Sequence, residues 1–190
     1  MQQYGHSDFR GMDVSLPGPM DLARQGVKGR DWYARARASI EAYAARHGFT
    51  VPCVCSILAI TSPRVHVSRN VAMADHYLRH GTYPPGSMPL VRRSLDRYEA
   101  TKTFGGIKSN AFARALWGDP NAVVVDVWMI RAFGRGDWPS MTDRRYRRIA
   151  GWIRGIATRL DWPAAEAQAA IWTGCRSQYG YTHGDLVMPD

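Results

Sequence analysis

Two residues of the central stretch have side chains suited to covalent chemistry, Lys108 and Asp126. Lys108 follows a Gly105-Gly106 turn, where the backbone can take positive φ and come close to a ligand. Asp126 ends the short apolar run 122–125. A lysine amine can attack an electrophilic carbon and form a Schiff base, and a carboxylate can stabilise a developing positive charge. We therefore expect a reactive cleft if the fold brings both side chains together.

Both residues also have ordinary structural interpretations. A lysine at a helix start is usually solvated, and an aspartate that ends an apolar run is usually the cap of the next helix. Taken singly, each residue fits the ordinary interpretation better. The joint pattern favours the functional one.

The stretch from Thr103 to Arg131 resembles the helix–hairpin–helix DNA glycosylase superfamily, of the endonuclease III kind. The resemblance rests on the glycine hairpin, on the separation of Lys108 and Asp126, and on the V-V-V-D-x-x-x-x-R segment that ends at Arg131. The family hairpin usually reads L-P-G-V-G, whereas residues 103–107 read T-F-G-G-I, without proline and with the glycines displaced. The resemblance covers about Pro52 to Gln178, and it is that of a distant, compact member.

The resemblance implies an all-α, two-lobed fold with the hairpin near 103–108. Residues 30–190 would form a single helical domain whose lobes share a cleft, and residues 1–29, which are punctuated by Gly and Pro, are interpreted as an irregular N-terminal arm. In the family, the hairpin grips the DNA backbone, the lysine is the nucleophile of bifunctional members, and the aspartate is the catalytic carboxylate. The implied function is a DNA glycosylase with AP lyase activity that flips out a damaged or modified base, with Lys108 and Asp126 in these roles.

Two alternatives keep the fold and change the function. Some phage proteins that resemble this superfamily modify DNA bases, by transferring an amine or amino acid onto an activated pyrimidine. A helix–hairpin–helix module that binds DNA without catalysis is the other. The first predicts a heavier base that stays in the strand, and the second predicts that Lys108 and Asp126 are dispensable.

Further residues are expected to contact DNA or to line a base pocket. The expected DNA contacts come from the hairpin and from the densest basic run: Lys102, Gly105, Gly106, Ser109, Arg144, Arg145 and Arg148. A basic run of this kind is equally typical of a solvated helix face. Polar and aromatic residues of three segments are the expected base pocket: Thr61, Ser62, Asn70, Gln168, Trp172 and Arg176. The resemblance places 61–62 where relatives fill the gap left by the flipped nucleotide, although a turn with a cap explains them equally well. Residues 168, 172 and 176 share one helix face, where a core tryptophan is the ordinary interpretation.

Composition favours a polyanionic partner. The chain has 190 residues, a formal net charge of +9 and a pI near 9.9. A nucleic acid is the expected partner, because we find no basic amphipathic helix with the large apolar face that a membrane surface requires. The resemblance implies DNA, expected to be double-stranded, although the sequence does not distinguish a duplex from a single strand. No obligate protein partner is evident.

Cysteine and histidine spacing predicts no cofactor and no metal. Cys53, Cys55 and Cys175 are interpreted as reduced thiols, and three cysteines cannot supply the four-cysteine iron–sulfur loop of many endonuclease III relatives. His76 and His80 have metal-ligand spacing on a helix but no third ligand nearby. The N-terminus has no apolar h-region and no apolar run reaches 18 residues, so we expect a cytoplasmic, nucleoid-associated protein of a bacterial or phage-infected cell.

Hydrophobic periodicity predicts helices and few strands. The expected helices cover 31–47, 54–60, 65–80, 90–100, a segment from 107 that ends at Gly118, 126–133, 142–160 and 164–176. For the apolar segment 54–60, periodicity alone also permits a strand. The predicted fold class is all-α.

Overall fold

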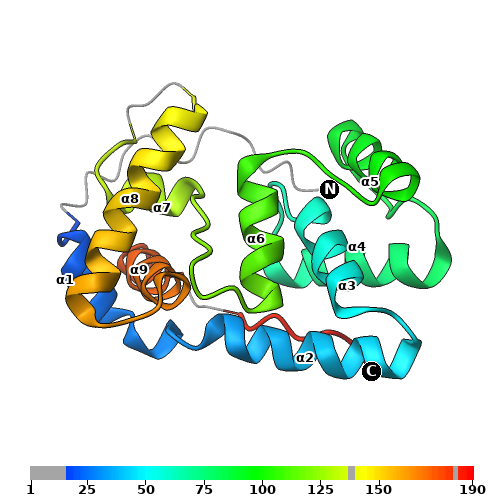
Figure 1. The fold of residues 1–190 in the computed structure, drawn as a ribbon, viewed down its shortest axis with the longest axis horizontal. Coiled ribbons are helices and arrows are strands. Elements are labelled where there is room, and N and C mark those ends of the chain that lie inside the picture. Colours follow the sequence, from blue (N-terminus) through cyan, green and yellow to red (C-terminus); the bar gives the residue numbers. More distant parts are fainter. Residues whose placement is uncertain (1–15, 137–139, 182–183) are drawn as a thin grey trace.

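The computed structural model describes residues 16–136, 140–181 and 184–190, and the regular elements among them are all helices (Figure 1). The α-helices are α1 (Pro19–Gln25), α2 (Trp32–His47), α3 (Val51–Thr61), α4 (Val67–His80), α5 (Pro89–Thr101), α6 (Ile107–Trp117), α7 (Val127–Ala132), α8 (Asp143–Leu160) and α9 (Ala164–Gln178). A single 3₁₀ turn, η1 (Val27–Gly29), joins α1 to α2. The all-α prediction is confirmed, and each predicted helix is present with its ends shifted by a few residues.

Two hydrophobic cores divide the molecule into two lobes (Figure 1). The first is built mainly from α2 to α5, with Ile40, Leu58 and Leu95 fully buried. The second is built from α1, α7, α8 and α9, with Ile153 and Ile171 fully buried. Because each lobe buries its own apolar faces, the surface between the lobes is free to carry polar groups.

α6 and α2 connect the lobes. α6 packs on α3 in the first lobe, while Ile107 and Ala111 on α6 contact the second core. α2 runs beneath α6 and the first lobe and also contacts α9 of the second lobe, and the C-terminal segment 184–190 lies extended along it (Figure 1). This segment is held by Leu186 and Met188, which are buried in the first core, and by the Met188 N–H, which donates to Ser39 Oγ (2.8 Å).

The interpretation of residues 1–29 as an irregular arm is wrong for its described part. Residues 19–25 form α1 and residues 27–29 form η1, both packed on α9. Leu22 and Ala23 are completely buried there. A seven-residue helix is too short to be stable alone, so its stability comes from tertiary packing that periodicity does not reveal. Residues 1–15 of the predicted arm lie outside the described residues.

Burial of two thiols gives a prediction about their reactivity. Burial raises the pKa of the Cys55 thiol to about 12 and that of Cys175 to about 11, whereas Cys53 is only half-buried. Because the thiolate is the reactive form, we expect iodoacetamide at neutral pH to label Cys53 first and the other two only after unfolding. Peptide mass spectrometry with and without urea checks the order, and rapid labelling of Cys175 in the native protein would contradict it.

No single helix in the described part of the chain is both long and apolar enough to cross a membrane. The segments 27–47 and 51–61 pass by length and composition only when joined, and the chain bends by 116° between them.

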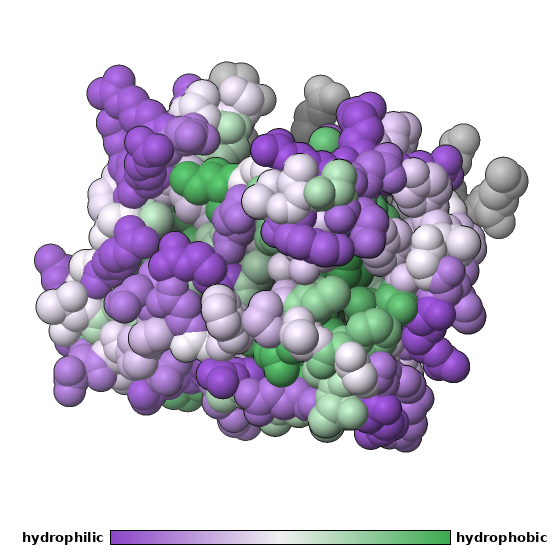
Figure 2. All heavy atoms as spheres, turned by 45° about the vertical axis from the view of Figure 1, so that its right-hand side comes forward, coloured by the Kyte–Doolittle hydropathy of each residue, from purple (hydrophilic) through white to green (hydrophobic). Residues whose placement is uncertain are grey.

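The face in Figure 2 is mostly hydrophilic, with hydrophobic side chains gathered mainly at the lower right.

Candidate functional site

A cavity of about 120 Å³ lies between the two lobes, and both Lys108 and Asp126 line it. Side chains from α2, the α3–α4 connection, α4, α6, the approach to α7, and α9 complete its wall. Four other predicted pocket or site residues reach the same cavity: Ser62, Asn70, Gln168 and Trp172. The fold therefore brings together residues separated by more than half of the chain.

The turn before α6 determines where Lys108 begins its helix. α5 ends at Thr101 and is capped by Lys102, whose φ of 52° is left-handed, and Gly106 precedes α6 with φ of 94°. Asn110 secures the turn, because its Nδ2 donates to Gly106 O (2.9 Å). Lys108 is the second residue of α6 and is half-buried. Within the described residues its ammonium group has no ion-pair or hydrogen-bond partner, so it is available to a ligand.

Asp126 is held from two sides. Its Oδ1 accepts from the backbone N–H groups of Trp128 (2.9 Å) and Met129 (3.1 Å), which makes it the N-cap of α7. Its Oδ2 accepts from the Trp172 indole N–H (3.0 Å). The ordinary interpretation of Asp126 as a cap is thus confirmed, and the same carboxylate also faces the cavity. Three uncharged donors, two backbone N–H groups and one indole N–H, fix its orientation.

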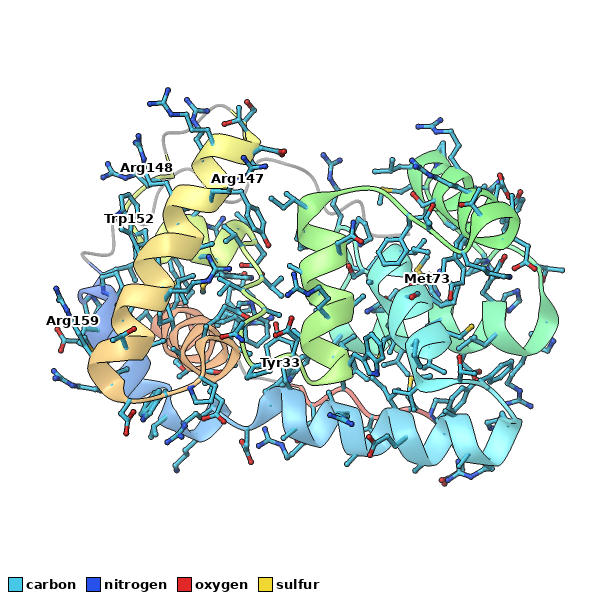
Figure 3. The ribbon with its side chains drawn as sticks, viewed as in Figure 1. Tyr33, Met73, Arg147, Arg148, Trp152 and Arg159 are labelled. Carbon is cyan, nitrogen blue, oxygen red and sulfur yellow. The ribbon has the colours of Figure 1, made fainter. Side chains whose placement is uncertain are left out.

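Aromatic rings form much of the cavity wall. The Trp32 ring lies 5.0 Å from that of Tyr33, 6.4 Å from that of Phe112 and 6.2 Å from that of Trp172, centroid to centroid. Tyr33 lies at the junction of the lobes (Figure 3). Burial raises the pKa of the Tyr33 phenol well above its ordinary value, and the charge of Asp126 adds to this. The wall therefore offers flat apolar surfaces together with a neutral hydroxyl group.

Two buried amides supply the polar contacts of the cavity. Gln168 is 3% exposed, and its Oε1 accepts from the Tyr33 hydroxyl (2.8 Å). Asn70 is 4% exposed, and its Oδ1 accepts from the Thr61 hydroxyl (2.6 Å). Since a hydroxyl group occupies each amide oxygen, the amide nitrogens remain to donate to a ligand.

Two predicted pocket residues do not line the cavity. Thr61 is completely buried behind it and acts through Asn70, as just described. Arg176 stacks on the far side of Trp172, with its guanidinium carbon 4.5 Å from the ring centroid. Burial lowers the pKa of Arg176, while the nearby Asp126 charge acts in the opposite direction. Thr61 and Arg176 therefore contact residues that line the cavity, Asn70 and Trp172, without lining it themselves.

The predicted DNA contacts fall into two groups, and none of them lines the cavity. Hairpin residues 102, 105 and 106 are exposed next to the start of α6, and Ser109 is half-buried there. Lys102 forms an ion pair with Glu99 (3.4 Å). The second group lies on α8, where Arg145 donates to Ser140 O (2.7 Å) and Arg148 points outward, away from Tyr33 (Figure 3).

Several cavity residues were missed by the sequence prediction. Phe112 lies one turn after Lys108 on α6, so helical spacing could have found it. Trp32 and Tyr33, at the start of α2, are also among the missed residues. The apolar residues Val65, Val67 and Val124 complete the missed set. For these aromatic residues of α2 and these valines the sequence contains no local signal, because their place at the cavity depends on packing between elements that are distant in sequence.

Fold and site together define an all-α, two-lobed protein with a lysine and a fixed carboxylate in an aromatic cavity between the lobes. The chain belongs to a family of unknown function (DUF7178), whose model matches residues 22–179. Comparison with curated proteins and with solved structures gives no match.

Proposed function

We propose that this protein is a DNA glycosylase with AP lyase activity, built on a helix–hairpin–helix glycosylase type of fold. The observation that carries the proposal is that Lys108 and Asp126 line one cavity between the lobes. α5, the turn at 102–106 and α6 would be the helix–hairpin–helix element.

The cavity suits a flipped base. A base inside a duplex is out of reach, so such an enzyme must extrude the nucleotide at a cost of a few kcal/mol. Stacking against the aromatic wall offsets part of that cost. The amide nitrogens of Asn70 and Gln168 would hydrogen-bond to the edge of the base. Because both amides are buried, a base that offers no acceptor to their nitrogens would bind less tightly, since each buried donor without an acceptor costs about 1–3 kcal/mol.

The reaction would use both charged residues of the cavity, Lys108 and Asp126. The Lys108 ammonium group first loses a proton to water, and the resulting amine attacks C1′ of the sugar. The C1′–N bond breaks, and its electron pair leaves with the base, which takes up a proton from water. Asp126 stabilises the positive charge that develops on the sugar and accepts the proton that the attacking amine loses. Cleavage of the C1′–O4′ bond, with protonation of O4′, then opens the sugar ring and gives a Schiff base. Loss of a C2′ proton to water forms the C2′–C3′ double bond, and the C3′–O bond breaks with its electron pair leaving on the 3′ phosphate, which cleaves the strand.

The hairpin would hold the DNA backbone. The first backbone N–H groups of α6 have no partner inside the helix, and a helix N-terminus favours a phosphate. Gly105 and Gly106 carry no side chain that would block the approach, and Arg97 lies close to Gly105. A phosphate bound here would place the adjacent nucleotide near Lys108.

Borohydride trapping tests the proposal. The protein is incubated with duplexes that carry different damaged or modified bases, and with an abasic duplex, in the presence of borohydride. We expect a covalent protein–DNA adduct with at least one duplex, because borohydride reduces the Schiff base on Lys108. Lys108→Ala should abolish the adduct, whereas Lys28→Ala, which removes an exposed lysine of η1, should retain it.

Three outcomes would contradict the proposal. An adduct that survives in Lys108→Ala would assign the nucleophile elsewhere. Bound DNA with neither adduct nor released base would exclude the lyase activity. A strand of increased mass with its base retained would identify a base-modifying transferase instead.

A further inference from the structure

The outer face of α8 carries a stripe of residues that the cavity does not use. Residues 144, 148, 152, 155 and 159 recur at helical spacing, and all five are exposed. Figure 3 shows Arg148, Trp152 and Arg159 on the outer side of α8, pointing away from Tyr33. The opposite face of α8 packs into the second core through Ile149 and Ile153. Apart from Trp152, the stripe therefore takes no part in the packing of the second core, and none of its residues lines the cavity between the lobes.

The arginines of this face are not neutralised by the protein. Elsewhere, arginines of α1, α2 and α6 pair with carboxylates: Arg24, Arg35, Arg37, Arg46 and Arg114. Among the described residues, four arginines of α8 have no carboxylate within salt-bridge distance: Arg144, Arg148, Arg154 and Arg159. The only acidic residue within α8 is Asp143, which lies 3.9 Å from Arg147. Like charges one turn apart on a helix repel, so an anionic ligand would stabilise this face.

Trp152 adds an aromatic surface in the middle of the stripe. It is 37% exposed, and its ring stacks on Phe133 at 5.5 Å between centroids and 23° between planes. Arg135 lies 5.5 Å from the ring, and the indole borders a cavity of about 600 Å³. The neighbouring Gly151 and Gly155 carry no side chain, and a Cβ at either position would have no atom within 4 Å. The indole is therefore held in place by its neighbours while part of it remains accessible.

We propose that the outer face of α8 binds single-stranded nucleic acid, with phosphates on Arg144, Arg148 and Arg159 and one unpaired base on Trp152. Arg144 and Arg148 are four residues apart, about 6 Å along the helix, and Arg159 lies about 16 Å beyond Arg148, so the three arginines can contact phosphates along one backbone with Trp152 between them. Stacking on Trp152 requires an unpaired base, which favours a single strand over a duplex. A membrane-binding helix would expose a wide apolar face, whereas Trp152 is the large apolar side chain of this stripe. The inference goes beyond the proposed excision and does not depend on it.

Fluorescence anisotropy of a labelled oligothymidylate, titrated with the full chain at several salt concentrations, tests this surface. We expect Arg148→Ala/Arg159→Ala to bind at least about tenfold more weakly and to reduce the salt slope by about 1.4, since each phosphate contact of a single strand contributes about 0.7. Trp152→Ala should weaken binding by about tenfold without changing the salt slope. The charge-matched control is Arg46→Ala/Arg79→Ala, which removes two exposed arginines of α2 and α4.

The comparison of these variants decides the inference. Equal losses in the stripe and control pairs would show a non-specific charge effect and overturn it. Unchanged oligothymidylate binding, with stripe-dependent binding to phosphatidylserine vesicles, would assign the face to a membrane and also overturn it. In a Lys108→Ala background, binding of the oligothymidylate should still depend on the arginines and the tryptophan of the stripe. A negative result for the excision chemistry can therefore be distinguished from a negative result for binding at α8.

Discussion

Gly174→Ala is expected to lower the free energy of unfolding by about 3 kcal/mol or more. A Cβ at Gly174 of α9 would lie 2.1 Å from the backbone oxygen of Leu22, and a Cβ at Gly26 would lie 2.0 Å from that of Ala170. The two backbones are therefore in direct contact, and no side-chain rotation can relieve the overlap. α1 would have to move away from α9 and expose Leu22, which is completely buried.

Gly155→Ala is the matched control, because Gly155 is also within a helix but has open space where the Cβ would be. Removing the conformational freedom of glycine from an exposed helix position should raise the free energy of unfolding by about 0.5–1 kcal/mol. Urea denaturation followed by circular dichroism compares the two variants with the parent protein. If Gly174→Ala were as stable as the parent, the packing of α1 on α9 would be refuted.

Asp126→Asn is expected to slow base release about a hundred- to a thousandfold, since it removes the charge that would stabilise the developing cation. Asparagine is as good an N-cap as aspartate, so α7 should remain capped. The carboxylate accepts from the α7 backbone with one oxygen and from the Trp172 indole with the other. Asparagine has a single side-chain oxygen, so it can keep only one of these two contacts. The lost hydrogen bond should cost about 1 kcal/mol of stability.

Trp172→Phe separates the loss of charge from the loss of this hydrogen bond. It also removes the hydrogen bond to Asp126 Oδ2, but it leaves the charge, the cap of α7 and an aromatic ring in place. We expect a similar loss of stability and a rate within about tenfold of the parent. Single-turnover release of the base found by trapping, measured beside urea denaturation, provides both readouts. Equal rates for Asp126→Asn and Trp172→Phe would leave Asp126 as a helix cap only.

Helix positions were largely predictable because their signals are local. The helices of residues 32–47, 67–80 and 107–117 each end at a glycine with positive φ: Gly48 (72°), Gly81 (65°) and Gly118 (99°). Side-chain caps at Asp126 and Thr142 start α7 and α8. These stops and caps depend on the chemistry of one or two neighbouring residues, which can be identified directly in the sequence.

Other segments have no local signal. α1 is short and is flanked by glycine and proline residues, which are typical of turns. Its stability depends on the close contact with α9 that Gly26 and Gly174 allow. The extended tail at 184–190 is held by side chains of α2, including Ser39. In both cases the stabilising partner lies more than a hundred residues away in the sequence.

The candidate site likewise has features with a local signal in the sequence and features without one. The sequence by itself determined that a lysine opens one helix and an aspartate caps another, because turn and cap chemistry is local. Only the tertiary structure decided that both side chains enter one cavity, that Tyr33 and Phe112 complete it, and that Thr61 lies behind its wall. Side-chain direction within a cavity depends on packing between helices that are distant in sequence, and residue spacing along one helix carries no information about that packing.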